Sequence, residues 1–307
     1  MIGICSIETF IPKGRLSNFE RKDRFDVNDD FIINKLGIYR VSRKDPEDDT
    51  SGLCCRVYDR LMQQTAPFDP QTIDVIAVCT QNPDYSLPHT AAIVHGKLGL
   101  PETCATFDIS LGCSGYVYGL AILESFMKAS NFKNGLLFTA DPYSKIIDPE
   151  DKSTSLLFGD AASVTLVGEN PIFKSGKFSF GTRGGGYPFL INRHGKLHMN
   201  GREIFNFSAR KVPEDIEKVL ALNRLSLDQI DLFLLHQGSK YIIDFIVKRL
   251  GIPPEKAPFV VKDFGNTVSS SIPIMLKDVL SDAHIKRIAM SGFGVGLSWA
   301  SGVLVRP

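Results

Sequence analysis

Three polar residues lie beside strand-like runs, at positions where a side chain could take part in chemistry: Cys113, His236 and Asn266. Cys113 follows a short run rich in β-branched and aromatic residues, 105–110, and an apolar helical pattern begins within a residue or two of it. A thiol at a helix N-terminus faces unpaired N–H groups and the positive end of the helix dipole, which favour the thiolate. We therefore expect a nucleophilic cysteine, although most free cysteines are small buried hydrophobes.

His236 and Asn266 occupy similar places further along the chain. His236 ends the apolar run 230–235 and precedes a helical pattern, and Asn266 lies in a polar cluster before a helix predicted over 268–281. In α/β proteins, ligands bind at loops that follow strand C-termini. A lone histidine there is more often structural, and a lone asparagine is more often a helix cap or turn former. Three complementary residues at three equivalent positions favour an active site.

Strand-type apolar runs alternate with apolar helical patterns along most of the chain, which predicts a layered α/β body. The middle, 155–207, instead carries β-rich runs separated by glycines, so we expect antiparallel strands or hairpins that bridge two halves. The run 181–187 lacks the Lys-Ser/Thr ending of a phosphate loop, and a mobile surface loop is expected. The predicted strands are 1–10, 73–80, 105–110, 135–140, 232–235, 257–261, 287–292 and 299–305, and the predicted helices are 51–64, 90–98, 212–222 and 239–250.

Composition narrows the function classes. At 307 residues the chain exceeds a typical single domain, so two similar units or one large α/β body are expected. A formal net charge of +1 offers no global attraction for nucleic acid or an acidic membrane. The six cysteines show no CxxC pair and no metal-type spacing with the six histidines, which favours a reducing, cytoplasmic setting without a metal site. Neither a signal peptide nor an apolar run of membrane-spanning length is visible.

Six blocks of the chain follow one another in a recognisable order: 108–120, 157–162, 199–205, 236–237, 265–267 and 292–299. Together they resemble the signature of the β-ketoacyl-acyl-carrier-protein synthase III family of the thiolase superfamily. The resemblance implies a duplicated, layered α-β-α-β-α fold, with residues 1–170 as the N-terminal half that carries the cysteine and 171–307 as the half that carries histidine and asparagine. It also implies a homodimer acting in fatty-acid biosynthesis, with acyl-CoA and acyl carrier protein as partners.

The residues suit the chemistry that this family performs. Cys113 would take the acyl group from acyl-CoA, and the backbone N–H groups of Cys113 and Val295 would form the oxyanion hole. His236 and Asn266 would donate hydrogen bonds to the thioester oxygen of malonyl-acyl-carrier protein and stabilise the enolate formed on decarboxylation. Because the leaving carboxylate supplies the carbanion, no metal or organic cofactor is expected.

Some positions depart from the family pattern. Lys35 and Lys152 replace arginines near the coenzyme A nucleotide, and Phe31 replaces an adenine-stacking tryptophan. The lysines keep the positive charge but cannot make bidentate contacts, and the phenylalanine keeps an aromatic ring but stacks less well than tryptophan. At the rim that receives the carrier protein, Asn206 and Tyr241 replace residues that are often basic, which predicts weaker, redirected or absent docking. Val295 is bulkier than the glycine often found in its turn. The other expected substrate-binding residues are Phe205, Gln237 and Lys240.

Three functions fit the sequence. The first is the condensing enzyme just described, and the second is an acyltransferase of the same fold that passes the acyl group to a hydroxyl or amine of a sugar or secondary metabolite, with His236 as general base. The third is a non-catalytic partner subunit, which the intact Cys113, His236 and Asn266 disfavour. Asn266 in place of a carboxylate favours condensation, whereas the altered rim favours acyl transfer. Acyl chain length, and primary fatty-acid synthesis against a specialised pathway, stay open.

Overall fold

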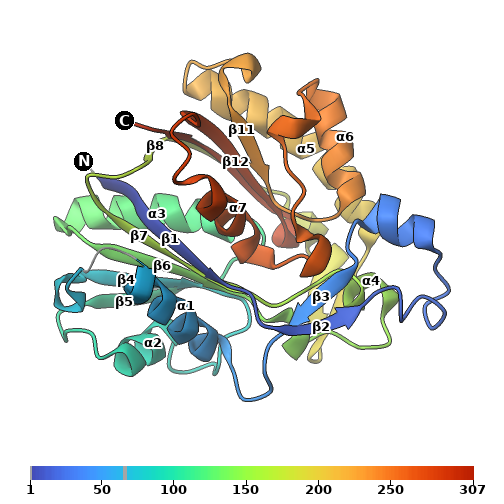
Figure 1. The fold of residues 1–307 in the computed structure, drawn as a ribbon, viewed down its shortest axis with the longest axis horizontal. Helices are drawn as coiled ribbons and strands as arrows, with labels where there is room; N and C mark the ends of the chain where they lie inside the picture. Colours follow the sequence, from blue (N-terminus) through green and yellow to red (C-terminus); the bar gives the residue numbers. More distant parts are fainter. Residues whose placement is uncertain (1, 65–67) are drawn as a thin grey trace.

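The computed structural model describes residues 2–64 and 68–307, and its framework is a pair of β-sheets (Figure 1). The first sheet has the strand order β1-β7-β6-β4-β5. Strands β4, β5 and β6 are parallel, with Val75 paired to both Ala105 and Gly135, whereas β7 is antiparallel to β6 and to β1. The strands are β1 Ile2–Phe10, β4 Val75–Cys79, β5 Ala105–Ile109, β6 Gly135–Ala140 and β7 Ala162–Glu169.

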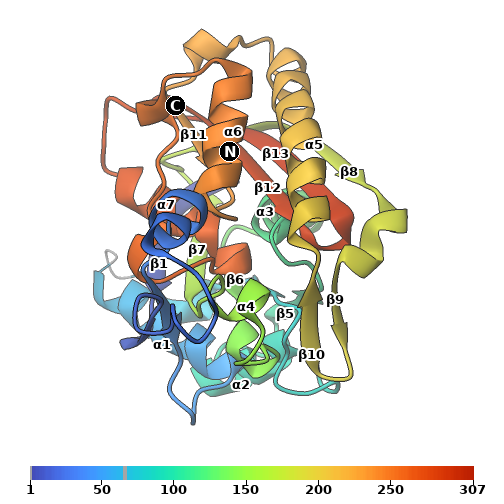
Figure 2. The same ribbon diagram turned by 90° about the vertical axis from the view of Figure 1, so that its right-hand side faces the viewer.

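The second sheet has the order β11-β12-β13-β8. Strands β11 and β12 are parallel, and β13 is antiparallel to both of its neighbours, β12 and β8. A separate hairpin, β9–β10, extends from this half towards α4 (Figure 2). The strands are β8 Lys174–Thr182, β9 Leu190–Arg193, β10 Lys196–Met199, β11 Leu232–Leu235, β12 Arg287–Gly294 and β13 Ser298–Val305.

Helices cover both faces of each sheet and give the molecule five layers. α3 and α7 pack between the sheets, where Tyr116 and Leu120 of α3 meet Met275 and Leu276 of α7 in one apolar core (Figure 1). α1 and α2 cover the outer face of the first sheet, and α5 and α6 cover the outer face of the second. This arrangement confirms the layered α-β-α-β-α fold. The helices are α1 Thr50–Gln64, α2 Thr90–Leu98, α3 Gly115–Ser130, α4 Lys152–Ser155, α5 Gly201–Leu222, α6 Lys240–Leu250 and α7 Ser271–Val279.

Burial explains why the central strands are continuously apolar. All five residues of β4 are buried, because the strand lies inside a sheet that is covered on both faces, as in other parallel sheets. The predicted strands and helices in this half, 73–80, 105–110, 135–140, 51–64 and 90–98, are confirmed to within two residues at each end. The β-rich middle is confirmed as β7, β8 and the β9–β10 hairpin.

The prediction of a strand over 257–261 is wrong. The backbone groups that would pair in a sheet are taken by a side chain instead: Gln237 Nε2 donates to the Pro258 carbonyl at 3.2 Å, and Gln237 Oε1 accepts from the Val260 N–H at 3.0 Å. The segment therefore lies as an irregular loop that ends in a short 3-10 turn, Val261–Asp263.

Two helices differ from their predicted bounds. The helix predicted over 212–222 begins earlier, as α5 at Gly201, because the Asn200 side chain accepts a hydrogen bond from the Glu203 N–H at 3.2 Å and caps it. The helix predicted over 268–281 is a 3-10 turn followed by α7, because Val268 has a φ of +54°. A β-branched residue in this left-handed region breaks a regular helix. The predicted loop 181–187 partly extends β8 and then forms a 3-10 turn, Gly184–Phe189.

Candidate active site

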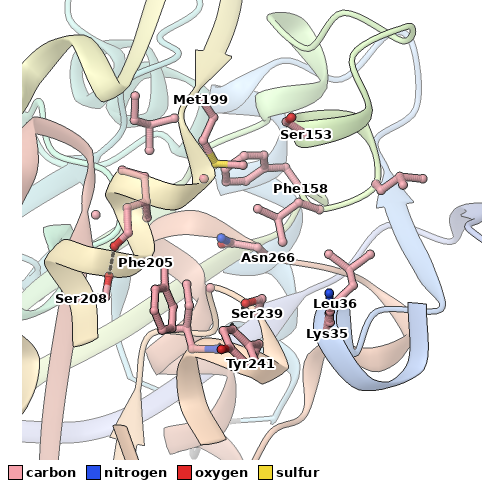
Figure 3. Close-up of a pocket in the computed structure, with 18 of the residues that line it drawn as sticks. Lys35, Leu36, Ser153, Phe158, Met199, Phe205, Ser208, Ser239, Tyr241 and Asn266 are labelled. Atoms are coloured by element: carbon pink, nitrogen blue, oxygen red, sulfur yellow. Dashed lines mark hydrogen bonds between the residues drawn. The ribbon is translucent and has the colours of Figure 1, made fainter. Parts of the chain in front are cut away.

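A cavity of about 390 Å³ opens to the surface, and Cys113, His236 and Asn266 all line it. The three residues come from the β5–α3 turn, the loop after β11 and the loop before α7. Asn266 points into the middle of the cavity, with Phe158 on one side and Phe205 on the other (Figure 3). Most of the remaining wall is apolar, and the buried Ser208, which also lines the cavity, donates its hydroxyl proton to the Ile204 carbonyl at 2.8 Å.

Cys113 is 3% exposed and lies two residues before the first residue of α3. Two backbone N–H groups, those of Val295 and of Cys113 itself, act on the thiol and lower its pKa. Burial has the larger effect and raises the pKa of Cys113 to about 12. The helix terminus favours the thiolate, as expected from the sequence, but desolvation of the charged form has the larger effect, so the buried thiol favours its neutral form.

A glycine lies against the sulfur. A Cβ atom at Gly294 would stand 2.7 Å from Cys113 Sγ, and one at Gly292 would stand 2.7 Å from the Cys113 carbonyl oxygen. The glycines of the 292–296 turn thus let the β12 backbone approach the thiol closely enough for the Val295 N–H to reach it. Close backbone approach is a common reason for glycine at a site.

His236 is 2% exposed and follows the last residue of β11. Its backbone N–H donates to the Ser291 carbonyl at 2.8 Å, which continues the parallel pairing of β11 with β12. In the ring, Nδ1 lies 2.8 Å from Ser271 Oγ, and the ring packs edge-on to Phe293 at 5.5 Å. Burial lowers the pKa of His236 to about 3, so the ring is neutral at physiological pH.

Asn266 is held by the block 157–160 from the other half of the chain. Its N–H donates to the Leu157 carbonyl at 2.9 Å, and its carbonyl accepts from the Gly159 N–H at 2.9 Å, so the two segments form a parallel bridge. Asn266 Oδ1 accepts from the Val268 N–H at 2.8 Å, which leaves Nδ2 facing His236 Nε2 at 3.4 Å. The amide orientation is thereby fixed.

The predicted binding residues divide into two groups. Phe31, Lys35, Lys152 and Phe205 line the cavity and lie towards its mouth, where Lys152 Nζ is 5.8 Å from the centre of the Phe31 ring. Val295, Asn206, Lys240 and Gln237 lie outside the lining. Asn206 is exposed on α5, Lys240 pairs with Asp244 on α6, and Gln237 is fully buried and donates to the Leu235 carbonyl at 2.8 Å.

An aromatic cluster at the mouth was not predicted as a unit. The Phe205 ring stacks on Tyr241 at 5.0 Å, and Phe245 meets Phe205 edge-on at 5.3 Å. Tyr241 is 51% exposed, and it lies beside Phe205 at the cavity rim (Figure 3). We call Phe205, Tyr241 and Phe245 the aromatic rim.

Three consecutive serines were also missed as functional candidates. Ser269 Oγ donates to Asp141 at 2.6 Å, Ser270 Oγ lies 2.7 Å from Thr139 Oγ1, and Ser271 Oγ contacts His236. All three serines are at most 1% exposed. They fasten the loop that carries Asn266 to the end of β6 and to the histidine. The signal in the sequence is a run of hydroxyl residues that leads into an apolar helix.

Two family models match the chain: 3-oxoacyl-[acyl-carrier-protein] synthase III over residues 107–184 and its C-terminal model over residues 220–306. The β-ketoacyl-[acyl-carrier-protein] synthase III of Limosilactobacillus reuteri is 34% identical over 98% of both chains, and that of Lactococcus lactis is 32% identical over 96% of both. The solved structure of the Thermus thermophilus synthase III superposes with a TM-score of 0.91, at 30% identity over 99% of both chains.

Fold and site together define an acyltransferase of the condensing type within the thiolase superfamily. The likeness extends over nearly the whole chain in relatives and solved structures alike. The chain belongs to the β-ketoacyl-[acyl-carrier-protein] synthase III family. Within residues 2–64 and 68–307, no helix is long and apolar enough to cross a membrane, and no cluster of His, Cys, Asp and Glu could hold a metal ion.

Proposed function

We propose that this protein condenses an acyl group from acyl-CoA with a malonyl group on acyl carrier protein, releasing carbon dioxide. The observation that carries the proposal is the convergence of Cys113, His236 and Asn266 on one cavity, with two N–H groups aimed at the sulfur. The curated relatives are named as synthases of this kind, which favours condensation over transfer to a hydroxyl or amine.

In the first half-reaction, Cys113 Sγ attacks the thioester carbon of acyl-CoA. The carbonyl oxygen becomes an oxyanion, and the N–H groups that now reach the sulfur, those of Cys113 and Val295, would stabilise it. When the tetrahedral intermediate collapses, the bond to coenzyme A breaks. The thiol proton of Cys113 leaves with coenzyme A as its free thiol, so the acylated enzyme carries no net charge change. Because the resting thiol is neutral, this proton transfer is part of the acylation step.

In the second half-reaction, the malonyl thioester loses carbon dioxide and forms an enolate. His236 and Asn266 donate to the enolate oxygen; Nδ2 of Asn266 is the donor because its Oδ1 is occupied by the Val268 N–H. Neutral His236 suits this role, since burial disfavours an imidazolium. The enolate carbon then attacks the acyl group on Cys113, the bond between that acyl carbon and the sulfur breaks, and the Cys113 thiolate that leaves takes up a proton from solvent. Carbon–carbon bond formation therefore needs no general base, a role that the Asn266 carboxamide could not fill.

At the mouth, we assign Phe31, Lys35 and Lys152 to the coenzyme A nucleotide. Both lysines are exposed and can pair with phosphates as point charges.

Asn206, Lys240 and the aromatic rim would form the carrier-protein side. Because α6 also exposes Lys248 and Arg249, an acidic carrier protein would meet these cations next to a large apolar patch. Tyr241→Ala should raise the KM for malonyl-carrier protein and leave acyl loading from acyl-CoA unchanged.

We further propose a cytoplasmic homodimer that joins along the β5 edge, and we keep 170/171 as the boundary between the two halves. β5 is the last strand in the order of the first sheet as the structure describes it, and exposed sheet edges are normally covered. Beside it, Ile122 and Phe126 of α3 and Phe180 of β8 are between 39% and 42% exposed. All six cysteines are free thiols, which supports the reducing compartment. Light scattering on Phe126→Asp should show a monomer where the parent chain is a dimer.

The test of the proposed function is intact-protein mass spectrometry with a panel of acyl-CoAs, followed by a chase with malonyl-carrier protein. We expect Cys113 to gain the acyl mass and to lose it as a ketoacyl product. Cys113→Ala should gain no mass, whereas Cys55→Ala, which removes a half-buried thiol outside the cavity, should behave like the parent. An adduct that leaves only when an alcohol or amine is added would refute condensation.

A further inference from the structure

The proposed condensation places a requirement on His236, and the inference below rests on it. To donate to the enolate oxygen, the nitrogen that faces the cavity, Nε2, must carry the proton. A neutral imidazole has a single N–H, so Nδ1 must then be bare and must accept a hydrogen bond. Because His236 is buried, the donor to Nδ1 must be a neighbouring protein group.

Two groups act on the ring. Ser271 Oγ is 2.8 Å from Nδ1, and the Val268 backbone carbonyl raises the pKa of His236. A carbonyl accepts and cannot donate. The Val268 N–H is committed to Asn266 Oδ1 at 2.8 Å, and the Gln237 amide is committed to backbone carbonyls of Leu235 and Pro258. Among the residues that the structure describes, the Ser271 hydroxyl is therefore the donor available to Nδ1.

We propose that Ser271 is a positioning residue for condensation: its hydroxyl donates to Nδ1 of His236 and keeps the histidine proton on Nε2, next to the Asn266 amide. The distance between Nε2 and Asn266 Nδ2, 3.4 Å, is long for a hydrogen bond and suits two donors that lie side by side and aim at one oxygen. Ser271 thus prepares the enolate site without touching the substrate.

The backbone around Ser271 keeps its hydroxyl in place. Ser271 is 1% exposed and begins α7, and the two preceding serines tie the same turn to Asp141 and Thr139. The competing acceptor for its proton, the Val268 carbonyl, lies further away at 3.1 Å. Val268 itself holds a left-handed φ of +54°, a conformation that a β-branched residue adopts only under constraint from its surroundings.

Removal of the hydroxyl should reverse the tautomer. In Ser271→Ala, Nδ1 is left with the Val268 carbonyl, so the proton moves to Nδ1 and Nε2 becomes an acceptor for the Asn266 amide. The cavity then loses its histidine donor, and the remaining amide is turned towards His236. Loss of one such donor lowers a rate by about 10²–10³-fold. We expect that fall in kcat for condensation, with little change in KM and no change in the rate of Cys113 acylation by acyl-CoA.

The experiment compares the parent chain with Ser271→Ala, Ser271→Thr and Ser270→Ala. Long-range ¹H–¹⁵N spectra of protein labelled at histidine report the tautomer directly, and a His236→Gln spectrum assigns the resonance. The parent should show a proton on Nε2, Ser271→Ala a proton on Nδ1, and Ser271→Thr a return towards the parent in both tautomer and kcat. Ser270→Ala removes an equally buried hydroxyl that contacts Thr139 rather than His236, so its tautomer should match the parent.

The outcomes separate the inference from the proposed function. A parent spectrum with the proton on Nδ1, or a Ser271→Ala variant that condenses at the parent rate, overturns the role of Ser271. If the parent is acylated but never releases carbon dioxide from malonyl-carrier protein, the proposed function fails, while the tautomer spectra still report whether Ser271 orients the ring. If Ser271→Ala does not fold, the Ser271→Thr tautomer and its kcat decide instead: a hydroxyl role requires that they change together.

Discussion

A single methyl group at Gly294 should block loading of the nucleophile. In Gly294→Ala the new Cβ would stand 2.7 Å from Cys113 Sγ and 2.8 Å from Cys113 Cβ. Comfortable contacts between such atoms are about 3.5–4.0 Å, so the methyl overlaps the cysteine by about 1 Å. Neither side can retreat easily, because Gly294 ends β12 and Cys113 is packed at the start of α3.

The overlap should cost about 1–3 kcal/mol of folding stability, the usual range for overpacking. The larger effect is on chemistry, since misplacement of a reacting atom by about 1 Å can lower a rate by about 10²-fold. The assay is the initial rate of acyl-adduct formation with a short acyl-CoA, measured by intact mass, with a thermal melt to show that the variant is folded.

Gly185→Ala is the matched control, because a Cβ there has no neighbour within 4 Å. It should load at the parent rate and melt at the parent temperature. If Gly294→Ala is folded and acylates as fast as Gly185→Ala, then Cys113 is not confined by this glycine and the steric argument is wrong.

Three further predictions concern the loop around Asn266. Burial raises the pKa of Asp141 from 3.8 to about 6, so the folded state holds a proton that the unfolded chain has lost; stability should fall by about 3 kcal/mol as pH rises across that window. Asp141→Asn should abolish this fall in urea titrations at pH 4 and pH 7, and an unchanged difference would contradict it. Gly159→Ala places a Cβ 1.8 Å from the Phe264 carbonyl oxygen and should cost more than about 3 kcal/mol; a parent-like urea midpoint would show otherwise. Asn266→Asp sets a carboxylate against the enolate, so condensation should fall by at least about 10²-fold while acyl loading persists, and loss of both would point to a folding defect.

The positions of Cys113, His236 and Asn266 could be predicted because each depends on local pattern. For Cys113 and His236, a strand-like run followed by a helix places the polar residue at the carboxyl end of a sheet. Asn266 was expected from a polar cluster before a helix, and its bridge to Phe158 holds it in place without a strand of its own. The cavity gathers all three residues. The protonation state of Cys113 could not be predicted in the same way. The helix terminus is visible in the sequence, but the degree of burial that raises the thiol pKa to about 12 depends on side chains from distant segments.

The neighbour of the histidine shows a second limit. The resemblance led us to expect Gln237 at the substrate, but its amide holds the 258–260 loop. Successive residues of an extended segment point to opposite sides, so one faces the cavity and the next faces away from it. The contact of Ser269 with Asp141, across 128 positions of the chain, has no local periodicity that could reveal it. The strand expected over 257–261 failed for the related reason that Gln237 occupies its backbone.

Because Phe158 and Asn266 form a bridge between the two halves of the chain, the site is complete only when both halves have folded and packed together. Consider a folding intermediate in which the first sheet has formed but the second has not docked. Its Cys113 lies near the start of α3 but lacks the Val295 N–H, the His236 ring and the Asn266 amide that surround it in the folded protein. Such an intermediate would be slow to capture acyl groups. We expect acylation to recover only as the two sheets dock, so its recovery after dilution from denaturant would measure the rate of that docking.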